Sequence, residues 1–589
     1  MIIFSSALLI FATVLTLVYL MMLLLSDRYK GLGRRPQGVK TAKIALVSAF
    51  ILMVLLMVFQ TLWSTSLFYF LLYPITIFVL LIATIESPDS NRMYLIFSVV
   101  LLHLIVLSGW FPASGIFIGE RTAALIQLEA AGKWNPSWTM LNPYYSPFPM
   151  DLGLFFVFSA ATGLSNVNLF GGWIVGLLFV IAYDLVLFSL CKKIGGSWKV
   201  GVFGILLFAF TPPAAINAQP EWIASLFILV FLLGLVRALK SGPSVSNIVL
   251  VNLSYAVAIL VHGTALVGLV VVFVLFMSTY FGRRLGVNIA TTSRHRSFLF
   301  VVLVSVCVMT FLRLEFLGGL GSITTPLNGL VNAILGHGQA SSIIAQYVPL
   351  YDQFASPIIA YAWCVPISLG AAFVLYHVLG RAKKKSLGTV FASSLVITGA
   401  ALTLGGFLGA RLMASANLQR YLGYAGLVLF IPGAAIVFAK ISRSSSWKIL
   451  SVVLISLVLF SGIAMCDPAF SPQLYSNIVT VNPARQADVI EGETLYSILP
   501  SGISGFSTYE ILTAFSYVQL MPQFSGKVIN FGGSLKTQRF MVDSLMESGK
   551  AAPGIMYIWT PQILAVASNV SVNVVYDSGR HVAVRGAGQ

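Results

Sequence analysis

Residues 44–62 read IALVSAFILMVLLMVFQTL, a run of nineteen residues without one charged side chain. A helix needs about 20 apolar residues to cross the hydrocarbon core of a bilayer. Similar runs recur along the 589-residue chain, which is 58% hydrophobic and only 9% charged. Soluble proteins carry about 25% charged residues, so the composition excludes a string of soluble domains and indicates a multi-pass membrane protein.

The apolar runs predict an α-helical polytopic membrane protein with about fourteen transmembrane helices. The runs lie at 1–25, 44–62, 67–84, 93–110, 169–191, 198–213, 219–238, 247–262, 263–281, 298–314, 357–379, 387–409, 421–440 and 449–466. The first run lacks a basic amino-terminal flank and a small-residue cleavage site. We therefore interpret it as a retained helix rather than a signal peptide.

Lys and Arg residues predict the orientation of these helices. They gather in every second loop, for example at 28–43 and 381–385. Loops rich in Lys and Arg face the cytoplasm. We therefore expect the loops 111–168 and 315–356 and the tail 467–589 to lie outside. Membrane topology also accounts for the net charge of +17, so we expect no nucleic-acid partner.

The chain divides into three predicted parts. Residues 1–92 form accessory N-terminal transmembrane helices, and residues 93–466 form the main membrane module. The tail 467–589 is less hydrophobic, with strand-like runs at Val528–Phe531 and Val570–Tyr576. This pattern is typical of a small α/β domain, which we expect on the extracytoplasmic side.

The sequence lacks the motifs of soluble enzymes and metal sites. No P-loop, HExxH, GxSxG or GxGxxG motif is present, which disfavours an ATP-driven pump or a zinc protease. The four cysteines lie in or beside apolar runs without a CxxC spacing, so we predict neither a disulfide nor a zinc site. Asp184 lies within a span, where we expect it to pair with Lys192 or Lys193.

Polar and aromatic residues concentrate in the first long outer loop. Glu120 opens a predicted helix there, and an aromatic, Pro-rich turn follows at 144–149. We interpret the apolar stretch 151–165 as a helix that lies on the outer leaflet. This order of features resembles the GT-C glycosyltransferases, which use polyprenyl-phosphate sugars. It is most similar to their protein-mannosyltransferase and aminoarabinose-transferase branch.

Three more segments carry the resemblance, which covers about residues 93–440. They are Thr211-Pro212-Pro213 to Glu221-Trp222, Val261-His262-Gly263 and Arg420-Tyr421-Leu422. The resemblance implies a GT-C-like fold and the transfer of one sugar, with inversion, on the extracytoplasmic face. The donor would be a polyprenyl-phosphate-linked sugar, and the acceptor a protein, a lipid or a glycan. The resemblance leaves a divalent metal open, because Glu120 stands beside Arg121 where many members have a second acidic residue.

Transfer from a lipid phosphate needs a base for the acceptor hydroxyl and cations for the phosphate. Glu120 is the candidate catalytic base; the alternative is a carboxylate that only stabilises a helix N-terminus. Arg411 and Arg420 are candidate phosphate ligands, since a guanidinium group pairs well with phosphate oxygens. Their alternative role is contact with outer-leaflet headgroups.

Four further residues are candidates for substrate binding: Glu221, His262, Tyr421 and Asp352. Glu221 could orient the sugar or only stabilise a helix N-terminus. His262 could donate a hydrogen bond to phosphate or sugar, or only stabilise its turn. Asp352 lies in an outer loop whose length is typical of functional loops. No residue is assigned as a metal ligand.

Two other classes of protein stay open. The first is a transporter or flippase for lipid-linked sugars, and the second is a non-catalytic membrane assembly subunit. Transporters often show internal repeats and polar residues near the bilayer midplane. The candidate residues cluster at the outer edge of the membrane instead, which favours the enzyme. We expect the protein in the plasma membrane, surrounded by its lipids.

Overall fold

A computed structural model describes most of the apolar helices and parts of the tail. The described residues are 13–22, 24–25, 38–62, 67–108, 128, 132–133, 150–163, 173–209, 220–281, 293–316, 364–377, 386–412, 424–443, 445–466, 486–502, 504–507, 530–532, 556–559, 572–577 and 582–586. Each of the fourteen predicted spans overlaps helical residues. Among the described residues, the helices that are long and apolar enough to cross a membrane are Thr41–Val58, Ile223–Ser241, Gly263–Tyr280, Ser293–Glu315 and Leu387–Gly406. The predicted apolar helical architecture is thus observed, while the count of fourteen spans stays a prediction.

The chain forms two compact units. Unit one comprises Met1–Gly109 with Leu177–Asn477, and unit two comprises Trp110–Gly176 with Ile478–Gln589. The labelled helices of unit one are α2 (Gly38–Leu62), α3 (Leu67–Glu86), η1 (Asp89–Asn91), α4 (Arg92–Ser108), α8 (Trp173–Gly195), α9 (Trp198–Ala209), α10 (Pro220–Ser241), α11 (Val245–Val261), η4 (Gly263–Ala265), α12 (Leu266–Phe281), α13 (Ser293–Phe316), α17 (Leu387–Leu412), α19 (Tyr424–Val428), α20 (Ile431–Ile441) and α21 (Ser445–Cys466).

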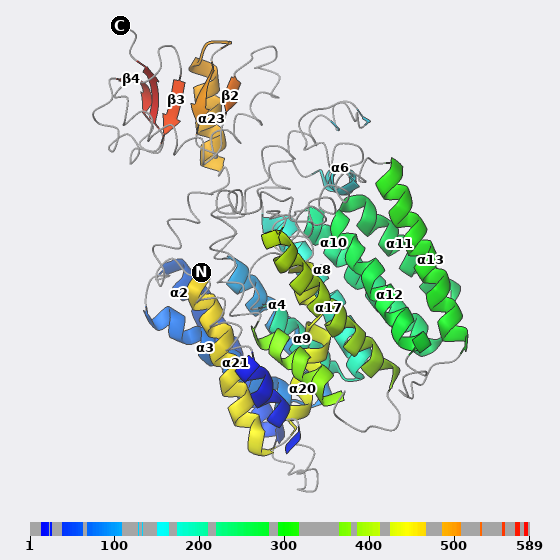
Figure 1. The fold of residues 1–589 in the computed structure, drawn as a ribbon. Coiled ribbons are helices and arrows are strands. Elements are labelled where there is room, and N and C mark those ends of the chain that lie inside the picture. Colours follow the sequence, from blue (N-terminus) through cyan, green and yellow to red (C-terminus); the bar gives the residue numbers. More distant parts are fainter. Residues whose placement is uncertain are drawn as a thin grey trace. The chain divides into compact units, whose positions relative to one another are not determined.

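The helices of unit one lie side by side. α10 packs along α11, and α12 packs along both α13 and α17 (Figure 1). A helix satisfies its own backbone N–H and C=O groups, which is why an apolar segment adopts this form in hydrocarbon. Large apolar side chains remain on the outside of the bundle, such as Phe311, which is 60% exposed. This is the surface that a membrane protein offers to lipid.

The two ends of the unit-one bundle differ in charge. At one end α8 finishes in Lys192 and Lys193, and Lys240 in the last turn of α10 donates to the carbonyl oxygens of Lys193 and Ile194. We call this the Lys240 end, and the opposite end, at the turn of His262, the His262 end. Lysines near helix C-termini complement the negative end of the helix dipole. The clustered lysines match the pattern predicted for cytoplasmic loops.

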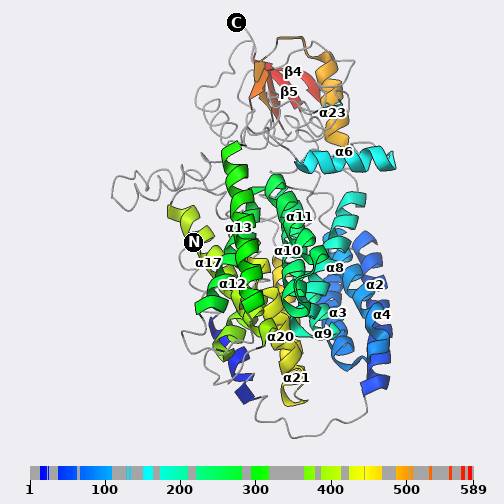
Figure 2. The same ribbon diagram turned by 90° about the vertical axis from the view of Figure 1, so that its right-hand side faces the viewer.

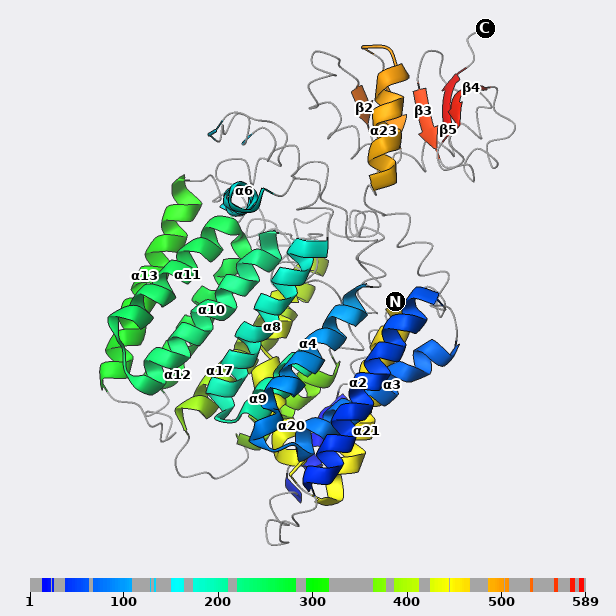
Figure 3. The same ribbon diagram turned by 180° about the vertical axis from the view of Figure 1, so that it is seen from behind.

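The N-terminal helices pack into unit one. α2 lies against α3, and α3 packs along α21, the last helix of this unit, as seen from behind in Figure 3. Lys448 at the start of α21 forms an ion pair with Glu86 at the end of α3. Lys199 Nζ also donates to the carbonyl oxygen of Ile85 at 2.6 Å. α2 and α4 are neighbours as well (Figure 2), so residues 1–92 contact the main module over several helices.

Unit two contains α6 (Met150–Thr162), α23 (Gln486–Ile498) and one sheet. The strands are β1 (Ser504–Ser507), β2 (Asn530–Gly532), β3 (Met556–Trp559), β4 (Val572–Asp577) and β5 (Val582–Gly586), in the order β2-β1-β3-β5-β4. β1 is parallel to β2 and β3, whereas β5 is antiparallel to β3 and β4. β2 and β4 fall in the two runs predicted as strands. The extracytoplasmic location of this tail stays a prediction.

α6 is the helix predicted to lie on the outer leaflet. It has 13 residues, so at 1.5 Å per residue it is about 20 Å long and too short to cross a bilayer. Leu152 and Phe155 are buried, while Val157 is exposed. A helix is therefore present at the predicted place, and its position at the membrane surface stays a prediction.

Two facing glycines allow α17 and α19 to approach closely. A Cβ atom added at Gly399 would lie 2.7 Å from the carbonyl oxygen of Gly426. A Cβ added at Gly426 would lie 2.9 Å from the carbonyl oxygen of Gly399. Small residues at such contacts let membrane helices pack through their backbones.

Replacing Gly399 tests this contact. We expect Gly399→Ala to lower the midpoint of heat denaturation in detergent, with a loss of about 1–3 kcal/mol from overpacking. Gly405→Ala in the same helix is the matched control, because a Cβ added at Gly405 meets no atom within 4 Å. Equal midpoints for the two variants would contradict the close contact.

Candidate functional site

Few ionisable side chains are buried in unit one. Among its described residues, the buried side chains of the Asp, Glu, His, Lys and Arg types are His103, Asp184, His262 and Arg313. Burying such a group without a partner costs free energy, and ionisable groups inside membrane proteins usually serve a function. They form two groups: His262 and Arg313 at the His262 end, and His103 with Asp184, each eleven residues from the Lys240 end of its helix.

His262 joins α11 to η4. Its side chain is 0% exposed, and Nδ1 accepts a hydrogen bond from the backbone N–H of Thr264 at 3.1 Å. Because Nδ1 is an acceptor, the neutral ring carries its proton on Nε2. His262 therefore stabilises its own turn, the alternative that the sequence left open beside substrate binding. Whether His262 also binds substrate stays a prediction.

Arg313 lies near the end of α13 and was missed by the sequence analysis. It is 8% exposed, and its Nε donates to the carbonyl oxygen of Ile259 at 3.3 Å. This carbonyl is among the last four of α11, which have no partner within the helix. The contact brings a buried cation to the chain three residues before His262, where it also complements the helix dipole.

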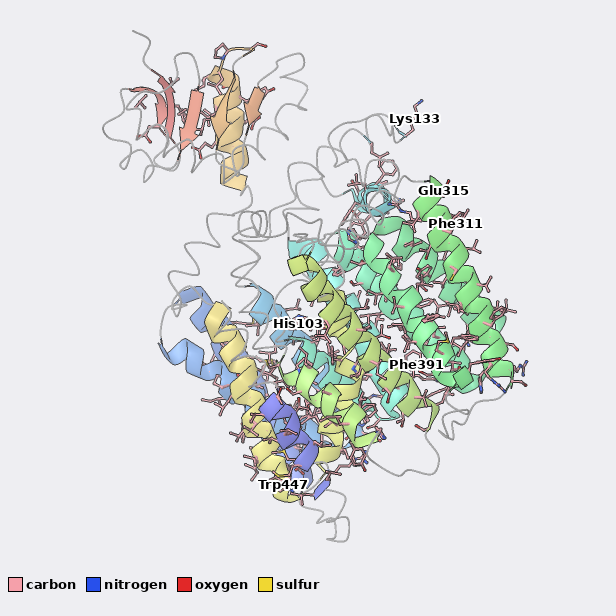
Figure 4. The ribbon with its side chains drawn as sticks, viewed as in Figure 1. His103, Lys133, Phe311, Glu315, Phe391 and Trp447 are labelled. Atoms are coloured by element: carbon pink, nitrogen blue, oxygen red, sulfur yellow. The ribbon has the colours of Figure 1, made fainter. Side chains whose placement is uncertain are left out.

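Three polar contacts, which we call the polar seam, join α11 to α13. They are Asn252–Ser305 and Tyr255–Thr310, both with oxygens 2.7 Å apart, and Ile259–Arg313. The contacts are spaced about one turn apart, so they fix the rotation of α13 about its axis. Arg313 is held toward α11, while Phe311 and Glu315 lie on the exposed stripe of α13 (Figure 4).

Glu221 and Arg411 belong to helices that reach the His262 end. Glu221 is the second residue of α10, which packs against η4 and runs antiparallel to α11. Arg411 is the next-to-last residue of α17. α17 begins at the Lys240 end, where Gly388 lies against the carbonyl of Ile194. The backbones of Glu221 and Arg411 are thus at the same end of the bundle, and their side chains lie outside the described part.

Four predicted site residues lie outside the described residues: Glu120, Asp352, Arg420 and Tyr421. Glu120 belongs to the segment after α4, Asp352 to the segment after α13, and Arg420 and Tyr421 to the segment after α17. Each of these helices ends at the His262 end. Among the described side chains, no three of the His, Cys, Asp and Glu types are grouped closely enough to hold a metal ion. The proximity of all these residues to Arg313 stays a prediction.

Asp184 has a different partner from the predicted one. It contacts His103 instead of Lys192 or Lys193, and His103 Nδ1 lies 3.0 Å from Oδ1 and 2.9 Å from Oδ2. The prediction was wrong because it considered only neighbours on the same helix. The actual partner is 81 positions away, on another helix.

No model of a known protein family matches the chain, and no curated protein matches it by sequence. Among solved structures, the chain is similar to ArnT from Cupriavidus metallidurans bound to undecaprenyl phosphate. The TM-score is 0.36 and the identity 16%, over 82% of this chain and 97% of ArnT. For ArnT in the apo state the TM-score is 0.35 with the same identity and coverage.

The chain is also similar to the oligosaccharyltransferase of Archaeoglobus fulgidus tethered with an acceptor peptide. The TM-score is 0.41 and the identity 10%, over 85% of this chain and 75% of that one. Because these TM-scores are below 0.5, the resemblance to the GT-C glycosyltransferases continues to rest on the sequence features quoted for it. At these TM-scores the likeness fixes neither the position nor the role of any residue.

Substitution of His262 separates its role in the turn from a role in substrate binding. His262→Ala removes the acceptor for the Thr264 N–H, and we expect a loss of roughly 0.5–2 kcal/mol in stability, as for other caps. His262→Asn keeps an acceptor and is expected to denature near the wild-type midpoint. If the ring also contacts substrate, both variants lose donor binding. If a folded His262→Asn protein binds the donor with wild-type affinity, the role of His262 is confined to the turn.

Proposed function

We propose that the protein is a membrane glycosyltransferase that moves a sugar from a polyprenyl-phosphate donor to an acceptor at the His262 end. The observation that carries this proposal is the buried Arg313, fixed beside the His262 turn at one end of an apolar helix bundle. A donor of this kind needs a cation at the membrane edge and an apolar surface beneath it. Unit one offers both.

A guanidinium group suits the phosphate of the donor. It stays charged at any relevant pH and presents its N–H groups in a planar fork that matches phosphate oxygens. The hydrogen bond from Nε to Ile259 and the polar seam hold Arg313 in place, so little side-chain freedom is lost on binding. We propose that Arg411 and Arg420 join Arg313 around the phosphate, and that His262 donates to the phosphate or the sugar.

Glu120 is the proposed base of the reaction. Its carboxylate takes the proton of the acceptor hydroxyl, whose oxygen attacks the anomeric carbon as the bond from that carbon to the phosphate oxygen breaks. Polyprenyl phosphate leaves as an anion that the arginines stabilise, so no general acid is needed. A single displacement inverts the anomeric carbon. Glu221, Tyr421 and Asp352 complete the proposed donor site.

The proposed location follows from the charge of the two ends. Lysines gather at the Lys240 end, which favours the cytoplasm for that end and the extracytoplasmic face of the plasma membrane for the His262 end. We would first test undecaprenyl-phosphate sugars as donors, because ArnT was solved with undecaprenyl phosphate. Peptide, lipid and glycan acceptors would be compared with each donor. A divalent metal is tested by adding a chelator to the same assay.

Replacing the proposed base is the first functional test. We expect Glu120→Gln to lower kcat by about 10²–10⁴-fold, the usual contribution of a positioned base, because the amide cannot accept the proton. The measurement is sugar transfer by purified protein in liposomes. Glu315→Gln is the control, since Glu315 is exposed on α13. Unchanged transfer by Glu120→Gln would remove Glu120 from this role.

A second prediction concerns the contribution of Arg313 to donor affinity. We expect Arg313→Gln to weaken donor binding by about 10–100-fold, the value of a hydrogen bond to a charged group. Arg313→Lys keeps the charge but loses the fork, so its affinity should fall in between. Binding of polyprenyl phosphate is measured directly, without an acceptor. Equal affinities for the three proteins would exclude Arg313 from the phosphate site.

One observation favours the alternative of a transporter or flippase. His103 and Asp184 are an ionisable pair buried within apolar helices, and such residues mark proton relays in transporters. The two functions are separated in liposomes that contain a labelled polyprenyl-phosphate sugar and no acceptor. A transporter moves the lipid between leaflets under a proton gradient, whereas the proposed enzyme shows turnover only when an acceptor is added.

A further inference from the structure

We propose that His103 and Asp184 are a positioning pair, a buried hydrogen-bonded contact that holds α4 and α8 in one relative arrangement. These two helices flank the segment that contains Glu120, the proposed base. The pair touches neither the proposed donor nor the proposed acceptor and acts through the placement of that segment. The claim that this pair supports catalysis rests on the proposed function. The claim that it fixes the arrangement of α4 and α8 rests on the geometry of these helices alone.

The two side chains meet at the same depth. Asp184 is eleven residues before the end of α8 at Gly195, and His103 is eleven residues after the start of α4 at Arg92. Both are therefore about 16 Å from the Lys240 end of their helices. Figure 4 shows His103 well inside the bundle, away from either end. The side chains are 1% and 0% exposed.

The two side chains are direct hydrogen-bond partners. His103 Nδ1 is almost equidistant from the two carboxyl oxygens of Asp184, at 3.0 and 2.9 Å. A net charge in hydrocarbon is costly. Two arrangements carry no net charge: an imidazolium with a carboxylate, and a neutral imidazole with a protonated carboxyl group. In both, each side chain is the partner of the other.

An aromatic side chain shields the pair. The ring of His103 meets Phe208 of α9 edge-on, with ring centroids 5.4 Å apart, and Tyr183, next to Asp184, stacks on Phe208 with ring centroids 4.7 Å apart. Phe208 and Tyr183 are buried. Low-dielectric surroundings strengthen a hydrogen bond and make an unpaired polar group costly. A slip or rotation of one helix would therefore leave a buried polar side chain without its partner.

Stability alone does not account for such a pair. The cost of removing two charges from water offsets much of their attraction, and apolar replacements are often equally stable. Apolar helix surfaces can pack in several registers, and a buried pair favours the one register in which its two members meet. α4 and α8 are apolar along most of their length. The contact between His103 and Asp184 fixes both their rotation and their relative depth.

The test compares three full-length proteins in liposomes: wild type, the apolar double variant His103→Leu/Asp184→Leu, and the exchanged variant His103→Asp/Asp184→His. Spin labels at Ser108 of α4 and Leu178 of α8, both in unit one and toward the His262 end, report the distribution of distances between these helices. Sugar transfer reports kcat and the KM for the donor. Ser305→Ala, which breaks a polar contact between α11 and α13, is the matched control.

We expect the apolar variant to denature at or above the wild-type midpoint, yet to show a broadened distance distribution. Its kcat should fall by about 10²-fold, the effect of misplacing a reacting group by about 1 Å, with an unchanged KM for the donor. The exchanged variant should recover the narrow distribution and much of kcat. Ser305→Ala should leave the distances between α4 and α8 at their wild-type values.

Two results would overturn the inference. One is a narrow distribution and full kcat in the apolar variant, and the other is a parallel rise in the KM for the donor, which would place the pair in the binding site. If the wild type transfers no sugar, the proposed function fails, and the distances alone decide the role of the pair. A broadened distribution in the apolar variant then supports the positioning of α4 by α8 without the reaction.

Discussion

The cost of leaving a polar group unpaired in hydrocarbon governs this protein. Backbone groups meet that cost by forming helices, which is why the apolar runs of unit one have no other regular structure among the described residues. Charged side chains avoid this cost in two ways. Most lie at the ends of helices, as Lys240 does when it donates to the last carbonyls of α8. The few that are buried, such as Asp184, have a partner.

The same cost distinguishes the cations at the two ends of the bundle. The Lys240 end uses its cations on helix carbonyls and on Glu86. At the His262 end, Arg313 is buried and held by a seam of polar contacts on one side. A cation that is fixed and shielded from bulk water binds an anion more strongly than a mobile lysine at a surface.

The helices could be predicted from sequence because the length and apolar composition of a segment are enough to identify such a helix. The run 44–62 lies within α2, and the stretch 151–165 includes all of α6 except Met150. Contacts between helices could not be predicted in this way. Helices that are apolar on all sides carry no periodic pattern that says which face meets which neighbour. For this reason the contact of Asp184 with His103 was missed.

Arg313 was missed for a related physical reason. Its neighbours Phe311 and Glu315 face outward, and a lone arginine at the end of a span is ordinarily an anchor to headgroups. Only the polar seam, whose members come from two helices, turns it inward. His262 was found because a short turn between two spans is visible in the sequence. The roles of Glu120, Arg420, Tyr421 and Asp352 depend on segments outside the described residues and stay predictions.

The packing of α21 on α3 has a consequence for biosynthesis. Glu86 is inserted into the membrane early, whereas Lys448 is synthesised only near the end of the membrane region. Until all the intervening helices have been inserted, α3 therefore lies beside lipid or the insertion machinery without α21. During this time the carboxylate of Glu86 lies at the water interface. The bundle closes only when α21 arrives. A ribosome that stops before α21 would leave a chain with an exposed seam along α3, a form that membrane quality control can recognise.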